Sequence, residues 1–292
     1  MRRGCAVAVA AVGMLLAAAP LSAQAWQTLT AQRQRQRLDS LAVRVHYGVG
    51  KLTLAAAAQP LLYDLRWRYD ADAFRPTHRY DATTHTLTVG AVGGDESLFS
   101  LGRHRARSNH DAELSNELSL GVARGVPLDL TLRLGAAEAN VDLSGLWLSR
   151  LRVETGASDA HVSFGTPNPT PMRSLDFKLG AASVTAVKLG NAHAERIHVT
   201  TGVGGADLDL GGAWATNASL RLDVVMGGVT LRVPRDVGVQ LRTTKILADV
   251  DAPRMIQREG ASVSDNWENA AHKLTIDANV TLGHVELVWL EQ

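Results

Sequence analysis

The chain has 292 residues, of which 46% are hydrophobic and 20% are charged, and its formal net charge is +1. This hydrophobic content is enough for a buried core and excludes wholesale disorder, and the balanced charge gives no electrostatic reason to expect a nucleic acid as partner. The single cysteine excludes a disulfide framework and any zinc site built on several cysteines.

The first 25 residues have the pattern of a secretory signal peptide. Two arginines precede an apolar run over 6–19, and Ala23 and Ala25 form the small-residue pattern that signal peptidase cleaves. We expect cleavage after Ala25 and export to the bacterial periplasm or the extracellular space. Cys5 lies inside this leader, away from the cleavage point, which disfavours a lipid anchor. A leader retained as a membrane anchor remains the alternative, and no later stretch is long enough for another membrane span.

A polar stretch and an N-terminal β segment are expected next. Residues 26–40 are rich in Gln and Arg and are interpreted as a solvated linker. In residues 41–112, apolar residues alternate with polar ones, as in half-buried strands. The alternation is clearest in three runs, at 41–54, 61–69 and 87–89.

Residues 113–292 repeat a unit of strand, glycine and strand. Five glycine positions follow one another at intervals of 21, 24, 22 and 25 residues, and apolar residues alternate on both sides of each. One such unit cannot bury its apolar face alone, so we expect neighbouring units to stack and share a continuous core. Residues 251–271 are expected to be an irregular insertion that caps the open end. The expected turn glycines are Gly135, Gly156, Gly180, Gly202 and Gly227, with further copies of the motif at Gly50 and Gly283.

This serial motif resembles the toast-rack domain, the C-terminal part of LiaF-like proteins of the cell-wall-active antibiotic response and of related adhesin-type proteins. The segment 47–54 resembles the start of the family's companion N-terminal segment, and the resemblance covers about 41–290. It implies an all-β fold, a right-handed and essentially single-stranded β-helix, without known catalytic residues. LiaF is implied to restrain a sensor kinase by means of transmembrane helices that precede this domain. Here a leader peptide stands in their place, so the resemblance implies binding at the envelope.

Neither a metal nor a cofactor is expected. His193, Glu195 and His198 are the residues of the chain that could form a surface metal site, but His198 alternates with apolar neighbours and should point outward from its strand. The cysteine pair that would complete a deaminase-type zinc motif is missing. We therefore favour a solvated surface for these three residues.

Two further patterns are interpreted as structural. Glycosidases place their two carboxylates on separate elements across a cleft, whereas the pairs in this chain each lie two residues apart on one strand. Trp147 and Trp214 lie in connectors and are expected to cover the corners of the stack, with carbohydrate stacking as the alternative. The carboxylate pairs are Asp207 with Asp209 and Asp249 with Asp251.

The sequence therefore favours an exported, non-enzymatic protein whose rigid β-solenoid surface binds an unidentified envelope protein or surface polymer, in connection with envelope stress. Two alternatives remain open. One is a polysaccharide hydrolase or lyase, which would need an acid, a base and a cation from neighbouring units in one groove. The other is an adhesin that associates with itself through the ends of the stack.

Overall fold

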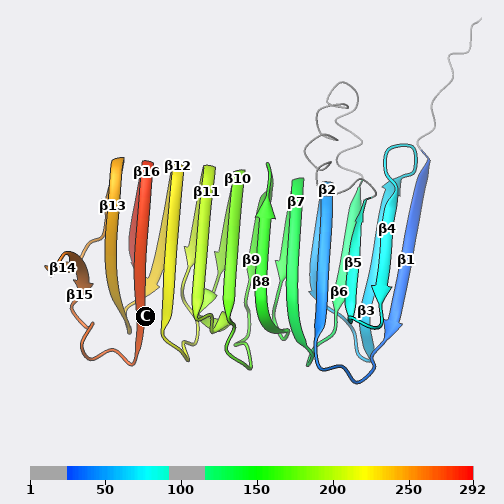
Figure 1. Cartoon of the computed structure of the whole chain (residues 1–292), viewed down its shortest axis with the longest axis horizontal. Coiled ribbons are helices and arrows are strands. Elements are labelled where there is room, and N and C mark those ends of the chain that lie inside the picture. The colour runs from blue at the N-terminus through cyan, green and yellow to red at the C-terminus, as the bar shows by residue number, and fades with distance from the viewer. Residues whose placement is uncertain (1–24, 92–115, 292) are drawn as a thin grey trace, which may run out of the picture.

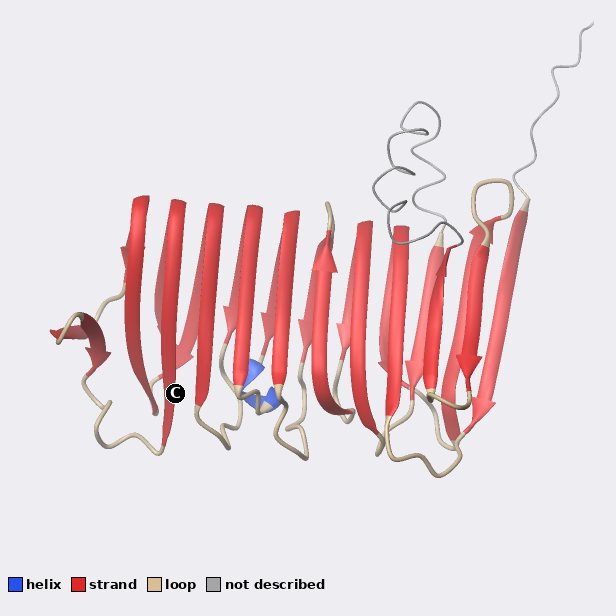
Figure 2. Cartoon of the chain, viewed as in Figure 1, coloured by secondary structure: helices blue, strands red, loops and turns tan. Residues whose placement is uncertain are grey.

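The computed structural model describes residues 25–91 and 116–291, so the expected leader lies outside it except for its last residue. All regular structure in the described residues is β, apart from one short 3-10 turn, η1 (Leu189–Ala192) (Figure 2). The all-β class expected from the sequence is confirmed. None of the described helices is long and apolar enough to cross a membrane.

The repeat region consists of long parallel strands that bend once, so that each contributes to two walls of the stack (Figure 1). Between β7 and β10, two shorter strands take the place of one bent strand, since β8 pairs with the first halves of both neighbours and β9 with their second halves. The strands are β7 (Pro127–Asp142), β8 (Trp147–Thr155), β9 (Asp159–Ser163), β10 (Ser174–Val187), β11 (Arg196–Asp209) and β12 (Ala218–Pro234).

At the C-terminal end, the spatial order of the strands departs from the chain order. β16 (His272–Leu290) lies between β12 and β13 (Val237–Asp251) and pairs in parallel with both. β16 has inward-facing buried residues in both of its halves, whereas β13 has no buried residue after Leu241. The outer position of β13 accounts for this difference, because β15 pairs with it only at Gln240 and Leu241.

The N-terminal end is built around β2 (Leu41–Ala56). One side of β2 pairs with β7, and the other pairs with β5 (Thr86–Ala91) along its first half and β6 (Glu117–Val122) along its second. Antiparallel strands then extend both walls: β4 on β5, β3 on β6 and β1 on β3. The bounds of these outer strands are Trp26–Gln34 for β1, Leu61–Asp70 for β3 and Pro76–Asp81 for β4.

Two irregular segments expected from the sequence contain strands. The expected linker at 26–40 includes β1, because Leu29 and Ala31 pack against the core and the guanidinium of Arg33 lies 4.2 Å from the centre of the Tyr80 ring. Its polar residues occupy the outer face of an edge strand, so composition alone misidentified it. The expected insertion at 251–271 contains a hairpin of β14 (Met255–Arg258) and β15 (Ala261–Ser264).

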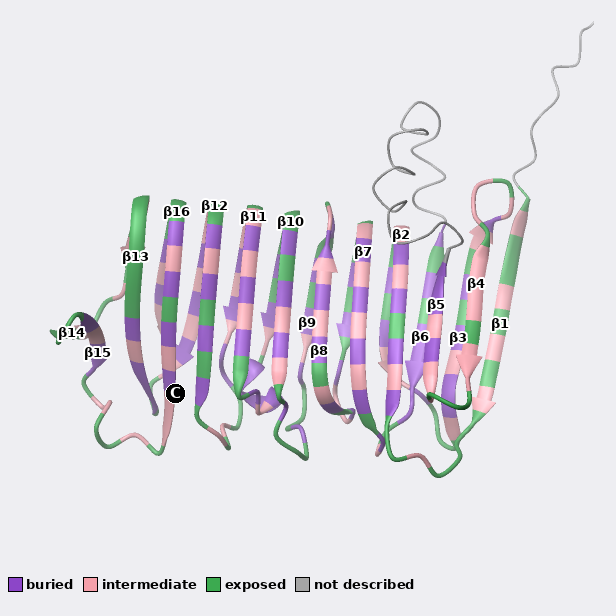
Figure 3. Cartoon of the chain, in the orientation of Figure 1, coloured by how far each residue is buried: buried purple, intermediate pink, exposed green. Residues whose placement is uncertain are grey.

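The core is a set of rows of Leu, Val, Ile and Ala that run across the strands, and Figure 3 shows the alternation of buried and exposed residues along each strand. Val199 and Leu222 stand in register and are both 0% exposed. Successive side chains of a strand point to opposite faces, so every second residue faces the core.

The bends require glycine where neighbouring strands approach closely. Gly227 has a φ of 136°, and a Cβ atom on it would lie 1.8 Å from the carbonyl oxygen of Gly204. Of the seven glycines expected at turns, only Gly156 lies between two strands. The other six lie within bent strands: Gly50 in β2, Gly135 in β7, Gly180 in β10, Gly202 in β11, Gly227 in β12 and Gly283 in β16.

A buried asparagine joins the strands of the N-terminal end. Asn116 is 1% exposed and its side-chain oxygen accepts a hydrogen bond of 2.6 Å from the Trp67 indole. Its carbonyl accepts a bond of 2.6 Å from the Tyr47 hydroxyl, and its amide nitrogen donates to the carbonyl of Val49. These bonds satisfy polar groups that would otherwise be costly to bury.

Candidate functional site

A row of arginines crosses the outer face of one wall near the N-terminal end. In this row Arg79 on β4 stands beside Thr88 on β5, then Arg44 on β2, Thr131 on β7 and Arg152 on β8. We call these five residues the arginine row. Since neighbouring strands lie about 4.8 Å apart, arginines on every second strand start roughly 10 Å from one another.

The arginine row borders a hollow of about 400 Å³. The hollow arises because the short side chain of Thr131 stands between the long side chains of Arg44 and Arg152. Arg133 and Arg150, on β7 and β8, line it as well. Inward-facing neighbours such as Leu130, Leu132, Leu151 and Val153 are fully buried, which fixes the backbone beneath the hollow.

The charges around the hollow are only partly paired. Arg150 lies 3.5 Å from a carboxylate oxygen of Asp129, and Arg133 lies 3.0 Å from one of Glu154. Arg44 and Arg152 have no ion-pair partner among the residues that the structure describes, and the Nε atom of Arg152 is buried without a hydrogen bond there. The site therefore offers two guanidinium groups to an anion, and guanidinium binds carboxylate and phosphate through two parallel hydrogen bonds.

A second hollow, of about 290 Å³, adjoins the first and shares Arg44 with it. Arg79 and Asp81 line this hollow. Backbone N–H groups of Thr83 and then Thr84 donate to Asp81 and lower the pKa of its carboxyl. Arg79 is exposed at the end of the row, and its positive charge also lowers the pKa of Asp81.

Farther along the same wall, a His, an Arg and an Asn converge on one carboxylate. Arg221 donates to Asp223 from two nitrogens, at 2.8 and 3.1 Å, and Asn279 donates at 2.8 Å. The Nε2 atom of His198 lies 2.9 Å from the same carboxylate. Burial opposes ionisation of Asp223, but these hydrogen bonds outweigh it and lower its pKa to about 2. Asp223 therefore holds no proton to donate near neutral pH and cross-links β11, β12 and β16.

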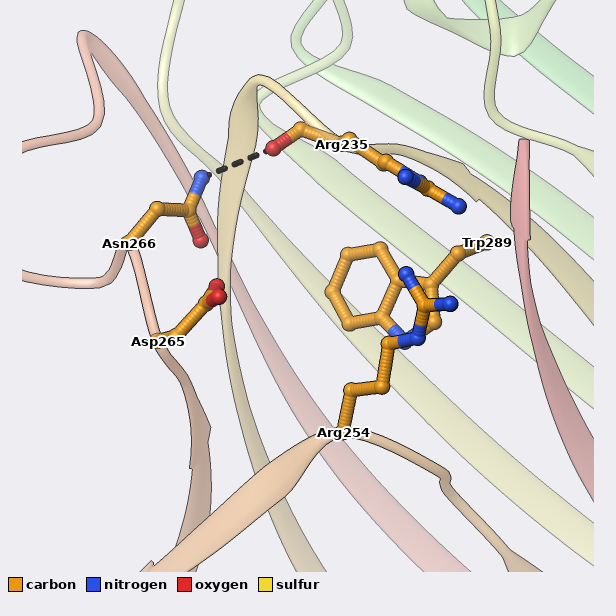
Figure 4. Close-up of a pocket in the computed structure, with 5 residues that line it drawn as sticks. All are labelled: Arg235, Arg254, Asp265, Asn266 and Trp289. Carbon is orange, nitrogen blue, oxygen red and sulfur yellow. Dashed lines mark hydrogen bonds between the residues drawn. The ribbon is translucent and has the colours of Figure 1, made fainter. Parts of the chain in front are cut away.

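A third hollow, of about 380 Å³, lies at the C-terminal end, where connectors meet the last residues of β16 (Figure 4). Trp289 lines it and donates from its indole to the carbonyl of Pro253, at 2.8 Å. Asn266 donates to the carbonyl of Arg235, at 3.0 Å, which joins the two connectors. Arg254 and Asp265 supply one charge of each sign.

The structure keeps the metal candidates of the sequence apart. The Nε2 atom of His193 lies 2.9 Å from the carbonyl oxygen of Ala213, whereas His198 belongs to the Asp223 cluster. Glu195 is exposed. No group of three or more metal-ligating side chains occurs within residues 25–91 and 116–291.

Within each carboxylate pair, the two residues differ in their surroundings. Asp207 forms an ion pair with Arg232, and Asp209 accepts a hydrogen bond of 2.7 Å from the backbone N–H of Gly211. Asp249 lies 4.0 Å from His284, and Asp251 is exposed at the end of β13.

The connector tryptophans differ in exposure. Trp147 is 38% exposed at the start of β8, and Trp214 is partly buried and donates to the carbonyl of Leu210, at 2.8 Å. Sequence reasoning gave no role to Arg44 and Arg152, which lie far apart in the chain. Each stands between two apolar residues, which predicts that it points outward, but only the pairing of β2 with β7 and of β7 with β8 places the two around one hollow.

Comparison with known proteins gives two adjoining family matches. Residues 22–172 match the N-terminal domain of toast_rack, and residues 186–287 match the C-terminal domain of the cell wall-active antibiotics response protein LiaF. No curated protein matches the chain.

Solved structures with a similar course of the chain include a candidate cell adhesion protein from Clostridium sporogenes ATCC 15579. It is 14% identical, with a TM-score of 0.48, and the match covers 91% of this chain and 100% of that one. Another is a candidate adhesin from Parabacteroides distasonis ATCC 8503, 9% identical with a TM-score of 0.38, covering 90% and 97% of the two chains. The family matches span most of the bent-strand stack described above, and the chain belongs to the toast-rack family.

Proposed function

We propose that this chain is an exported, non-enzymatic binding protein of the bacterial cell envelope, and that it holds an anionic surface polymer on its arginine row. The observation that carries the proposal is the pair Arg44 and Arg152, which flank one hollow without a carboxylate partner among the described residues. The repeated spacing of the row favours a polymer that bears carboxylate or phosphate groups at intervals over a compact ligand.

Two further observations support the envelope setting. The leader pattern at residues 1–25 is typical of exported proteins, and the C-terminal family match is to a protein of the response to cell wall-active antibiotics. N-terminal sequencing of the chain recovered from a bacterial envelope fraction tests export, since a mature chain that begins at Trp26 is the expected result.

The binding test titrates the purified chain with polygalacturonate, which bears carboxylates, with polyphosphate, and with neutral dextran. Binding to one or both anionic polymers should weaken as salt is added, because exposed charges are screened. The double variant Arg44→Gln/Arg152→Gln should lose about tenfold or more in affinity, which corresponds to about 1.4 kcal/mol. The relative response to the two anionic polymers identifies the preferred group.

A matched control separates a site from general charge attraction. Lys178→Gln/Arg196→Gln removes the same charge from exposed positions on β10 and β11, outside the hollow. Equal losses in the two double variants, or no binding of either anionic polymer, would show that the arginine row is not a binding site. Release of new reducing ends or unsaturated sugars from polygalacturonate would instead establish the lyase or hydrolase alternative.

A further inference from the structure

The arginine row contains the same arrangement twice. Its five residues lie on β4, β5, β2, β7 and β8, which follow one another across the wall (Figure 1). One hollow is lined by Arg79, Thr88 and Arg44. The second is lined by Arg44, Thr131 and Arg152. A ligand that follows the row therefore meets a cation, a hollow, the shared cation Arg44, a second hollow and a third cation.

The cationic part of the row is bounded at both ends. β4 pairs only with β5, so no further strand of the described chain continues the wall beyond Arg79. At the other end, Asp176 on β10 is the neighbour of Arg152 in the same row. Its carboxylate repels an anionic chain that passes Arg152. From Arg79 to Arg152 there are four strand spacings of about 4.8 Å, or about 19 Å in all.

Each hollow also presents one carboxylate. Asp81 lines the first hollow and Asp129 lines the second, and both belong to the outward-facing row next to the arginine row. A carboxylate accepts a hydrogen bond from a hydroxyl group, but it repels a phosphate or another carboxylate. The arginines therefore favour the anionic groups of a ligand, whereas the hollows between them favour parts that carry hydroxyl groups.

An extended chain of β-1,4-linked uronic acids has both kinds of group in the matching order. Every sugar bears one carboxylate and free hydroxyl groups. Successive sugars are rotated by about half a turn, so the carboxylates of alternate sugars point to the same side. Each sugar also advances the chain by nearly the spacing between strands, about 4.8 Å. With one sugar on each strand, every second carboxylate reaches an arginine and the sugars between them reach the hollows.

We propose that the arginine row binds five consecutive sugars of such a polyuronate across the strands, with the first, third and fifth carboxylates on Arg79, Arg44 and Arg152. The second and fourth sugars lie over Thr88 and Thr131 and point their carboxylates to solvent. A guanidinium group suits each contact because it binds a carboxylate through two parallel hydrogen bonds. The inference rests on the proposed function and adds the class of polymer, the path of the chain and the length of the site.

Calorimetric titration of the purified full chain with β-1,4-linked mannuronate oligomers of increasing length tests the number of sugars bound. Affinity should rise up to the pentamer and then level off, because a sixth sugar reaches no further arginine. The pentamer reaches three arginines and the trimer only two. The pentamer should therefore bind about threefold to tenfold more tightly than the trimer.

Single variants locate the ends of the site. Arg79→Gln removes one end, so the pentamer should bind about as tightly as the trimer, and the trimer should keep about half of its affinity because Arg44 and Arg152 still offer it one position. Arg44→Gln removes the arginine shared by both positions, so both oligomers should lose about threefold or more. Lys178→Gln, at an exposed position on β10 outside both hollows, is the matched control and should change neither affinity. Circular dichroism establishes that every variant is folded.

Two results would overturn the proposal. Affinity that keeps rising well beyond the pentamer, in the unmodified chain and in Arg79→Gln alike, would indicate general attraction of charges, which has no fixed length. Equal or tighter binding of linear phosphate oligomers of the same charge would exclude the preference for a sugar acid. Both results leave the proposed function standing, whereas failure of every anionic polymer to bind would remove the proposed function as well.

Discussion

Replacing Gly227 with alanine tests whether the bends of the stack depend on glycine. The φ of 136° at Gly227 belongs to a region that residues with a side chain enter at a cost of about 1–3 kcal/mol. The added Cβ would also lie 1.8 Å from the carbonyl oxygen of Gly204 on the neighbouring strand. Moving the two backbones apart costs about 1–3 kcal/mol more, by analogy with overpacked cores.

The expected loss is therefore about 2–6 kcal/mol in the free energy of unfolding. For chains of this size, that corresponds to a fall of roughly 5–20 °C in Tm. Thermal unfolding followed by the β signal in circular dichroism measures it.

Alanine variants of two other glycines separate the cost of the backbone conformation from the cost of moving the strands apart. Gly228→Ala changes the next residue, where φ is ordinary and the nearest atom to a new Cβ is 3.9 Å away, so stability should stay constant or rise by about 0.4–1 kcal/mol. Gly260→Ala adds a Cβ at a φ of 78° with nothing within 4 Å, so it should cost only the backbone term, about 1–2 kcal/mol. If Gly227→Ala and Gly228→Ala melt at the same temperature, the close approach of the strands does not constrain the bend.

Three further predictions concern the core, the wall and the N-terminal end. Val199→Asp buries an unpaired charge and should cost several kcal/mol in urea unfolding, whereas Ser219→Asp, at an exposed position facing outward beside Arg196, should cost little; equal losses would show that the inward and outward faces are misassigned. Asp223 has a pKa of about 2 in the folded chain, below the usual 3.8 of an aspartate, so it stabilises the fold above pH 4 and loses this contribution, at most about 2 kcal/mol, as the pH falls towards 2; Asp223→Asn should remove that pH dependence from acid unfolding curves. Tyr47→Phe removes the bond from the Tyr47 hydroxyl to the carbonyl of Asn116, which keeps its bond from the backbone N–H of Lys51, so the variant should cost about 0.5–1.5 kcal/mol in urea unfolding; an unchanged midpoint would contradict the role given to the hydroxyl.

Much of the local structure could be predicted from the sequence, because alternation decides which face of a strand is buried. Val199 and Leu222 each stand between two polar residues, which predicts that they face the interior, and both are 0% exposed. The same reasoning failed for residues 26–34, where an edge strand needs one covered face only and its exposed polar residues resemble a linker.

The neighbours of each strand could not be predicted in the same way. Alternation is equally compatible with β12 beside β13 or beside β16, so the order of these three strands is known only from their pairing in the structure. The arginine row was missed for a related reason. Thr131 on β7 is in register with Arg44 on one side and with Arg152 on the other. The hollow therefore depends on how β7 pairs with β2 and β8, which the sequence does not reveal.

The position of β16 between β12 and β13 has a consequence for how the chain acquires its structure. β13 is synthesised before β16, so β12 and β13 are both available while the strand that separates them is still missing. If β13 docks first on β12, it must leave again before β16 can enter. Pairing between strands that are far apart in the sequence is slow, and unpaired apolar edges stay exposed until it is complete. We therefore expect the C-terminal end to be the slowest part of the stack to fold, and the part most exposed to misfolding as the chain emerges.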